Sequence, residues 1–268
     1  MTKISYFGGG MQKISLDLNA SGDCRVPERW QLREPLHMQR LYYIKGGRGW
    51  FEAPDGKRTD FLPGKLYLHP FNLTDTFGHD PADPLDHLYF DFTSTPPIIS
   101  PAPLCFDVPE GSPLRLQLAA IERYLADCTE LPSHSYSKPR IGFTAHRQIM
   151  TGFLELLLLL LSTEHPLPFT DDSAVIDTLE RIRLDYASPL TVSDLAAQAG
   201  FELNYFIRRF RSVMGVTPYA YLRSWRLLKA RELMAGGCTV ARAAELVGYE
   251  NASSLSRALH ALPHGDIL

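Results

Sequence analysis

The chain has 268 residues, of which 45% are hydrophobic and 21% are charged, and its formal net charge is −3 at pH 7. This composition is typical of a soluble globular protein with one large or two smaller domains. The N-terminus lacks a signal pattern, the apolar run Leu156–Leu161 is shorter than the ~20 residues that span a bilayer, and the four scattered cysteines form no CxxC pair, so we expect a cytoplasmic protein without a membrane partner.

Residues 1 to about 108 are expected to form short strands. The stretch LYYIKGGRGWFEA alternates loosely and breaks at Gly46-Gly47, and DHLYFDF is another alternating run. Turn signals stand between such runs at Asp55-Gly56 and Pro63-Gly64. Short strands with turns at this spacing favour a small β-barrel or jelly roll.

Two helices are expected after the strands, over about residues 112–161. In the first, 112–127, Leu114, Leu118, Ile121 and Leu125 share one helix face. The second, 141–161, is apolar nearly all round at its end, which fits a core helix, a subunit interface, or both. The segment 164–172 has two prolines and no periodicity, and it predicts a linker between domains at 1–163 and 173–268.

The C-terminal region repeats one pattern. Gly200-Phe201-Glu202 and Gly248-Tyr249-Glu250 lie 48 residues apart, each between two helix-like runs. Thr191 to Asp194 is a capping-box pattern that opens the first of these runs. The pattern predicts two helix–turn–helix units joined by a long helix at 218–235, with the second recognition helix shifted by one residue. The predicted fold class is therefore α+β: a barrel, two helices and an all-α C-terminal domain.

The segment from about 174 to 260 resembles the DNA-binding domain of the AraC/XylS family of bacterial transcription regulators. The resemblance rests on LTVSDLAAQAGF, on AAELVGYENASSLSRAL and on Gly215–Arg223, which fits the family pattern G-x-[ST]-P-x-x-[YF]-x-R. It covers about a third of the chain. The N-terminal half resembles, less specifically, the family's cupin-like sensor domain, and the helices at 112–161 resemble its dimerisation elements.

The resemblance implies a set of DNA-contacting residues in the two recognition helices. Ile207 offers only apolar contact, Arg208 is expected at a guanine edge or a phosphate, and Arg209 and Arg211 are expected at phosphates. Arg257 has an alternative role in an internal salt bridge. The full set is Asn204, Tyr205, Ile207, Arg208, Arg209, Arg211, Ala252, Ser253, Ser254, Ser256 and Arg257.

The distribution of charge also indicates that the C-terminal region binds DNA. Between Arg208 and Arg231 there are seven basic residues and no acidic one, which indicates a phosphate-binding stripe or, alternatively, a solvated helix face. After Arg257 the sequence reads ALHALPHGDIL, where the family has an aromatic residue, a basic stretch and a closing helix. We therefore expect a second unit that is less stable and less tightly bound to DNA than the first.

The N-terminal half is expected to bind a small molecule without a metal or other cofactor. Its histidines are isolated and form no H-x-H pair, and no nucleophile, P-loop or dinucleotide pattern stands out, so an enzyme is not expected. Trp30 and Tyr43 are comparable candidates to the residues chosen for the ligand site, which are Trp50, Tyr67, His69 and Tyr89.

These features together predict a dimeric, ligand-responsive transcription regulator, with activation favoured by the resemblance. Its partners are promoter DNA, a small-molecule effector, a second copy of the chain and RNA polymerase. Two other functions also fit the sequence. One is a small-molecule-binding cupin protein whose DNA-binding domain is impaired, and the other is a cupin enzyme with a fused interaction module.

Overall fold

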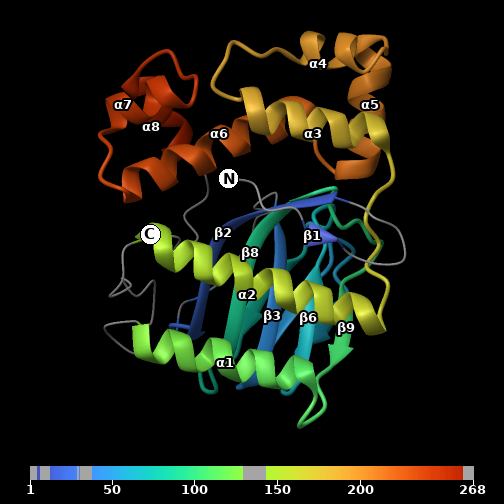
Figure 1. The fold of residues 1–268 in the computed structure, drawn as a ribbon, viewed down its shortest axis with the longest axis vertical. Coiled ribbons are helices and arrows are strands. Elements are labelled where there is room, and N and C mark those ends of the chain that lie inside the picture. The colour runs from blue at the N-terminus through green and yellow to red at the C-terminus, as the bar shows by residue number, and fades with distance from the viewer. Residues whose placement is uncertain (1–4, 7–12, 29, 31–37, 129–142, 262–268) are drawn as a thin grey trace. The chain divides into compact units, whose positions relative to one another are not determined.

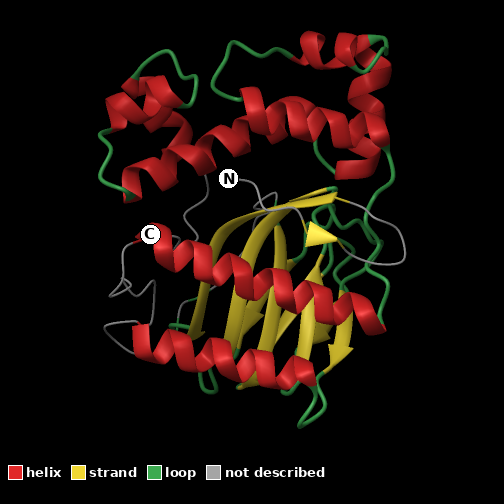
Figure 2. Cartoon of the chain, in the orientation of Figure 1, coloured by secondary structure: helices red, strands yellow, loops and turns green. Residues whose placement is uncertain are grey.

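The computed structural model describes residues 5–6, 13–28, 30, 38–128 and 143–261. It divides the chain into two compact units between Phe169 and Thr170. The α+β class predicted from the sequence is confirmed, because the first unit holds the strands and two helices and the second is all helical (Figure 2). None of the helices in the described ranges has the length and apolar character that crossing a membrane requires. The residues after Ala261, including Pro263, lie outside the described residues.

The strands of the first unit form two antiparallel sheets, as in a double-sheet jelly roll. The larger sheet has the strand order β1-β2-β8-β3-β6-β9, and the smaller has the order β5-β4-β7. The bounds are β1 Ser5–Tyr6, β2 Lys13–Arg25, β3 Gln39–Gly46, β4 Gly49–Glu52, β5 Arg58–Asp60, β6 Lys65–His69, β7 Thr76–His79, β8 Asp86–Thr95 and β9 Leu104–Asp107.

Two helices, α1 (Pro113–Cys128) and α2 (Phe143–Glu164), cover one face of the larger sheet (Figure 1). The four apolar residues predicted on one face of α1 are all buried, and they share a core with leucines of α2 and with β-strand residues such as Phe90 and Phe92. On its other side, α2 exposes Ile149, Leu156 and Leu159. Burial of this core fixes the large sheet so that its opposite face is turned toward the smaller sheet.

Six helices lie in the described part of the second unit. They are α3 (Ser173–Asp185), α4 (Val192–Gln198), α5 (Leu203–Met214), α6 (Pro218–Ala235), α7 (Val240–Leu246) and α8 (Ala252–His260). The long helix α6 runs between the α4–α5 pair and the α7–α8 pair (Figure 1). Each pair is one helix–turn–helix unit, as the repeated pattern predicts.

Candidate nucleic-acid interface

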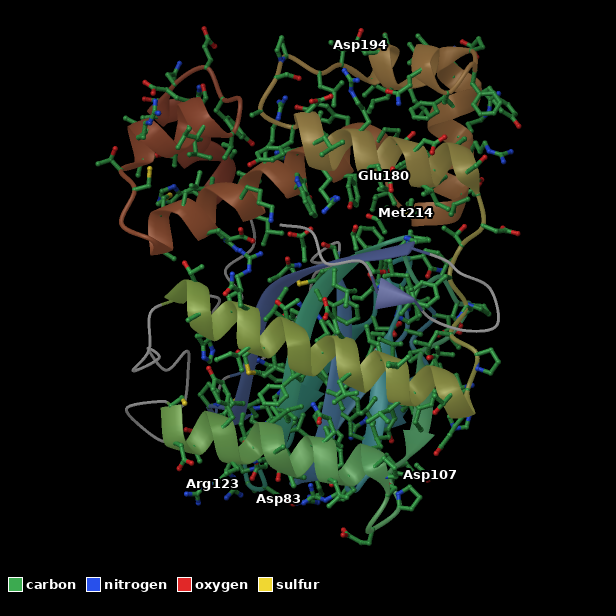
Figure 3. The ribbon with its side chains drawn as sticks, in the orientation of Figure 1. Asp83, Asp107, Arg123, Glu180, Asp194 and Met214 are labelled. Carbon is green, nitrogen blue, oxygen red and sulfur yellow. The ribbon has the colours of Figure 1, made fainter. Side chains whose placement is uncertain are left out.

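The two helix–turn–helix units begin with the same local chemistry. Thr191 caps α4 by accepting a hydrogen bond from the Asp194 amide, and the Asp194 carboxylate accepts one from the Thr191 amide in return. Figure 3 labels Asp194 at this end of α4. Thr239 caps α7 in the same way through the amide of Arg242. The two caps lie 48 residues apart, the same spacing as the two turn glycines.

The turns differ in length by one residue, and the recognition helices do not. Gly200 and Gly248 both have left-handed φ values, 71° and 77°. Glu202 caps α5 and Asn251 caps α8, so the second turn contains one more residue before its helix begins. Counted from the cap, Arg208 and Arg257 are both the sixth residue of their helices. The one-residue difference in spacing between the glycine and the arginine therefore lies in the turn. The two recognition helices have the same register from their caps.

Helix α5 presents a polar face opposite its core. Phe206, Phe210 and Met214 recur every four residues and are buried. Asn204, Arg208 and Arg211 are exposed at positions i, i+4 and i+7, which places them together on the other face. Met214, labelled in Figure 3, is the last residue of the helix. The predicted contact Tyr205 is also exposed, whereas Ile207 is half-buried.

Helix α8 repeats this arrangement with smaller side chains. Leu255 is buried at the position that Phe206 occupies in α5, and Ser253 and Arg257 are exposed at the positions of Asn204 and Arg208. The Arg257 guanidinium contacts its own helix, with Nε 3.4 Å from the Ser253 carbonyl oxygen. The other predicted contacts of α8 are half-buried, namely Ala252, Ser254 and Ser256.

Sequence reasoning missed His260, the last residue of α8. It is the ninth residue after the cap, which is the position of Arg211 in α5. The His260 side chain is exposed, and its Nδ1 lies 2.7 Å from the Ser256 carbonyl oxygen. Because a carbonyl oxygen only accepts, Nδ1 is the donor in that contact. The sequence signal for His260 is its distance from the cap Asn251, which equals the distance of Arg211 from the cap Glu202.

The basic stripe does not form one continuous surface. Lys229 pairs with Glu232 and lies over the Trp225 ring, and the Arg226 guanidinium points inward. Arg208, Arg211 and Arg223 are the exposed members of the stripe. Of the seven basic residues expected to bind phosphate, only three arginines are exposed. The sequence shows each residue as a charge but does not show its tertiary contacts.

Arg226 is the clearest structural member of the stripe. Its Nε donates to the Tyr186 carbonyl oxygen at 2.7 Å and its Nη2 donates to the Ser188 carbonyl oxygen at 2.8 Å. These carbonyls follow the end of α3, where helix geometry leaves acceptors unsatisfied. Partial burial lowers the pKa of Arg226, although a guanidinium remains charged at neutral pH. Arg226 thus fastens the loop between α3 and α4 to α6.

Replacing Arg226 with leucine is expected to lower the free energy of unfolding by about 2 kcal/mol, since two hydrogen bonds to a charged group are lost. The measurement is urea unfolding of the full chain followed by circular dichroism. Arg211→Ala is the matched control, because that exposed side chain is expected to change stability by less than about 0.5 kcal/mol. Equal stabilities for the two variants would contradict the role assigned to Arg226.

In the first unit, the predicted ligand residues Tyr67, His69 and Tyr89 come together on the inner face of the large sheet. Tyr42 pairs across the strands with both Tyr67 and Tyr89, and Arg40 pairs with His69, so these side chains share one face. Trp50 does not join them.

Trp50 lies on the outer face of the small sheet, where Arg58 covers its ring at 3.6 Å. Its neighbour Phe51 points inward, with its ring 4.9 Å from that of His69. Trp30, the alternative candidate, packs beside His79 and His87, whereas Tyr43 belongs to the core under the helices. Strand alternation, which aromatic character alone does not reveal, separates the two groups.

This inner face buries polar groups among aromatic rings. Arg40 and Asp91 form a buried ion pair, with Nε 3.3 Å from Oδ1. Three buried ring nitrogens have no hydrogen-bond partner among the described residues: His69 Nε2, His79 Nδ1 and His87 Nδ1. Buried polar atoms of this kind are rare in native proteins, and an ordered water or a bound ligand is the usual partner. No group of three or more potential metal ligands occurs in the described part of the chain.

Burial lowers the pKa of His87 to about 4, whereas the pKa of an exposed histidine is about 6.5. The unfolded chain therefore binds a proton between these values that the folded chain does not bind. Stability rises with pH in this window and is lost as the pH falls from about 6.5 toward 4.

Between pH 7.5 and pH 5, His87 is expected to account for a loss of about 2 kcal/mol in the free energy of unfolding. The measurement is urea unfolding at both pH values for the natural chain and for His87→Gln. The variant is expected to lose about 2 kcal/mol less than the natural chain over this range, whatever its stability at pH 7.5. Identical pH dependences would show that His87 titrates normally in the fold.

A small cavity of about 50 Å³ lies elsewhere in the first unit. It is lined by residues of β9, α1 and the end of α2, including Asp107, Leu114, Leu161 and His165. It contains none of the four predicted ligand residues, and its volume suits a water-sized guest rather than an organic effector.

Comparison with known proteins finds relatives of the C-terminal helical region. Residues 195–262 match the family model described as a helix-turn-helix domain. An AraC-like transcription regulator of Streptomyces lividans is 37% identical over 99 residues, which are 35% of this chain and 33% of that protein. The chain spans about a third of the length of the curated relatives it matches.

The fold of nearly the whole chain is similar to that of ToxT from Vibrio cholerae. An apo single-substitution variant of ToxT from strain SCE256 has a TM-score of 0.57 at 10% identity, covering 92% of each chain. Wild-type ToxT bound to an unsaturated fatty acid, from the same strain, has a TM-score of 0.52 at 9% identity, covering 97% of this chain and 92% of that one. At these identities the likeness shows a common fold.

Proposed function

Since its C-terminal region matches a helix-turn-helix family model and is similar to AraC-like transcription regulators, we propose that the chain is a sequence-specific transcription regulator that binds promoter DNA through α5 and α8 and responds to a small molecule. The single observation that carries the proposal is the equivalence of Arg208 and Arg257. Each is exposed and sixth from the cap of its helix, so one chain presents two matched recognition helices.

The two polar faces divide into base-reading and phosphate-binding positions. Arg208 and Arg257 suit a guanine edge, where an arginine bonds O6 and N7 together. Asn204 suits an adenine edge, and the serines of α8 suit bases or phosphates less selectively. Arg211 and its counterpart His260 stand later in their helices, near the groove wall, where phosphates lie. This division predicts stronger sequence preference at the site of α5 than at the site of α8.

Binding is expected to depend steeply on salt, because each phosphate contact releases counterions. The proposed phosphate contacts are few, namely Arg211, Arg223 and His260. With two or three such contacts, the logarithm of the association constant should fall with the logarithm of salt concentration with a slope of about −2 to −3.

For the effector, we propose the inner face of the large sheet as the binding site, with Tyr67, His69 and Tyr89 joined by Tyr42 and His87. ToxT, which shares the fold, is bound to an unsaturated fatty acid in one structure. The inner face described here differs in charge from a site for an acid. Its Arg40 guanidinium is paired with the Asp91 carboxylate, and its imidazoles are neutral, since burial lowers the pKa values of His69 and His87. These groups favour an uncharged molecule with several hydrogen-bonding groups.

The remaining partners follow from the same assignment. We propose a homodimer that uses the exposed face of α2, where Ile149, Leu156 and Leu159 form an apolar stripe at helical spacing. We propose activation through RNA polymerase as the mode of regulation and the cytoplasm as the place of action. No catalytic role is proposed for any residue.

The experiment that tests the proposed function is an in vitro selection of DNA from a random pool by the full-length protein at two salt concentrations. Enrichment of recurring sequence boxes by the natural chain, and their loss with the double variant Arg208→Ala/Arg257→Ala, is the expected result. The absence of any enriched sequence at low salt, from protein with a cooperative unfolding transition, would contradict the proposal.

A further inference from the structure

Arg209 stands beside the polar face of α5 but is held by its own domain. Its Nη2 lies 3.1 Å from Asp172 Oδ2, and its Nη1 donates to the Tyr205 hydroxyl at 3.4 Å. The guanidinium carbon also lies 5.6 Å from the centre of the Phe201 ring. Three neighbours thus contact one side chain, and its positive charge lies beside a carboxylate while 39% of the side chain stays exposed.

Asp172 is the residue that caps α3, and its two carboxylate oxygens have separate tasks. Oδ1 accepts a hydrogen bond from the Val175 amide at 3.2 Å, which caps the helix. Oδ2 faces Arg209. The Asp172 side chain is 12% exposed and the Arg209 side chain is 39% exposed, so the carboxylate is the shielded partner of the pair. The contact therefore joins the start of α3 to α5, the recognition helix of the first helix–turn–helix unit.

The second helix–turn–helix unit, α7–α8, has no counterpart of this contact at the matching position. Arg209 is the seventh residue after the cap of α5, and Ala258 is the seventh after the cap of α8. Ala258 packs against the core of the second helix–turn–helix unit and carries no charge. The contact thus belongs to α5 alone, which is the recognition helix with the larger base-reading side chains.

We propose that Arg209 is a positioning residue for DNA recognition rather than a phosphate contact, and that its pairing with Asp172 sets the orientation of α5 in the major groove. This inference rests on the proposed function of α5. It replaces the sequence-based expectation of a phosphate contact, because both terminal nitrogens of the guanidinium already contact neighbours within the domain.

The test compares three variants of the full-length protein on the selected operator and on unrelated DNA of the same length. Asp172→Asn keeps an oxygen for the Val175 amide and removes the charge, and Arg209→Gln removes the other partner. Arg211→Gln is the matched control for a phosphate contact two residues away. Affinity is measured over a range of salt concentrations by fluorescence anisotropy, and thermal unfolding verifies that each variant is folded.

For Asp172→Asn and for Arg209→Gln we expect operator affinity to fall about fivefold, while affinity for unrelated DNA and the salt slope stay at the natural values. The double variant should be no weaker than either single variant, and Arg209→Lys should restore part of the loss. Arg211→Gln should lower affinity for both DNAs and reduce the salt slope by about one.

The inference is overturned if Arg209→Gln reduces the salt slope as Arg211→Gln does, or if Asp172→Asn raises affinity for both DNAs by releasing a cation. It is overturned equally if both variants bind the operator like the natural chain. Failure of the proposed function is a different result, in which the natural chain itself shows no preference for any operator over unrelated DNA.

Discussion

Alanine at Arg208 or at Arg257 is expected to weaken operator binding by about 5- to 150-fold in either case, because each removes about 1–3 kcal/mol of base-specific contact. The two losses are expected to be separate in kind. Arg208→Ala should relax the preferred base in one box of the operator, and Arg257→Ala should relax it in the other.

Titration of labelled operator with each variant measures the losses, and repeating the selection with each variant locates them. Arg123→Ala is the control, since Arg123 is an exposed residue of α1 that pairs with Asp127. It should bind like the natural chain. A loss for Arg208→Ala with none for Arg257→Ala would show that the second unit does not read bases, in spite of its matched register.

The largest effect on stability is expected from Gly248→Ala, which should lower the free energy of unfolding by about 3–5 kcal/mol. An alanine there would adopt a left-handed φ of 77° and place its Cβ 2.7 Å from the Ala187 carbonyl oxygen. That oxygen belongs to the loop that Arg226 fastens at Tyr186 and Ser188, so it cannot withdraw without breaking those hydrogen bonds.

Gly200→Ala is the matched variant in the first helix–turn–helix unit. Gly200 has the same conformation, with φ of 71°, but its added Cβ meets no atom within 4 Å. The expected loss is therefore only the conformational cost of about 1–2 kcal/mol. Urea unfolding of both variants measures the difference. Equal losses would show that the second turn does not pack against the loop after α3 as described.

The helical unit was predictable because its signals are local. Caps such as Thr191, turn glycines and Pro218 at the start of α6 act within a few residues of themselves, so each helix boundary is written beside the helix. The shift of one residue between the units was predicted as a difference in the recognition helices. It belongs to the turn instead, because the extra residue precedes the cap Asn251.

The site was less predictable because side-chain partners come from distant segments. Arg209 and Arg226 have the same sequence character as Arg208 and Arg211, and only the tertiary positions of Asp172 and of the loop after α3 distinguish them. The separation of Trp50 from the other ligand candidates was unpredictable for a related reason. Its aromatic character suggested a ligand site, whereas the alternation of β4 directs Phe51 inward and Trp50 outward.

The measurement that tests the central claim most directly is hydroxyl-radical footprinting of the selected operator with the natural chain, with Arg208→Ala and with Arg257→Ala. Two matched recognition helices predict two protected tracts on one face of the DNA, about 10 base pairs apart. Each variant should lose protection chiefly in its own tract. A single protected tract that Arg257→Ala leaves unchanged would contradict the claim that one chain reads DNA with both of its helix–turn–helix units.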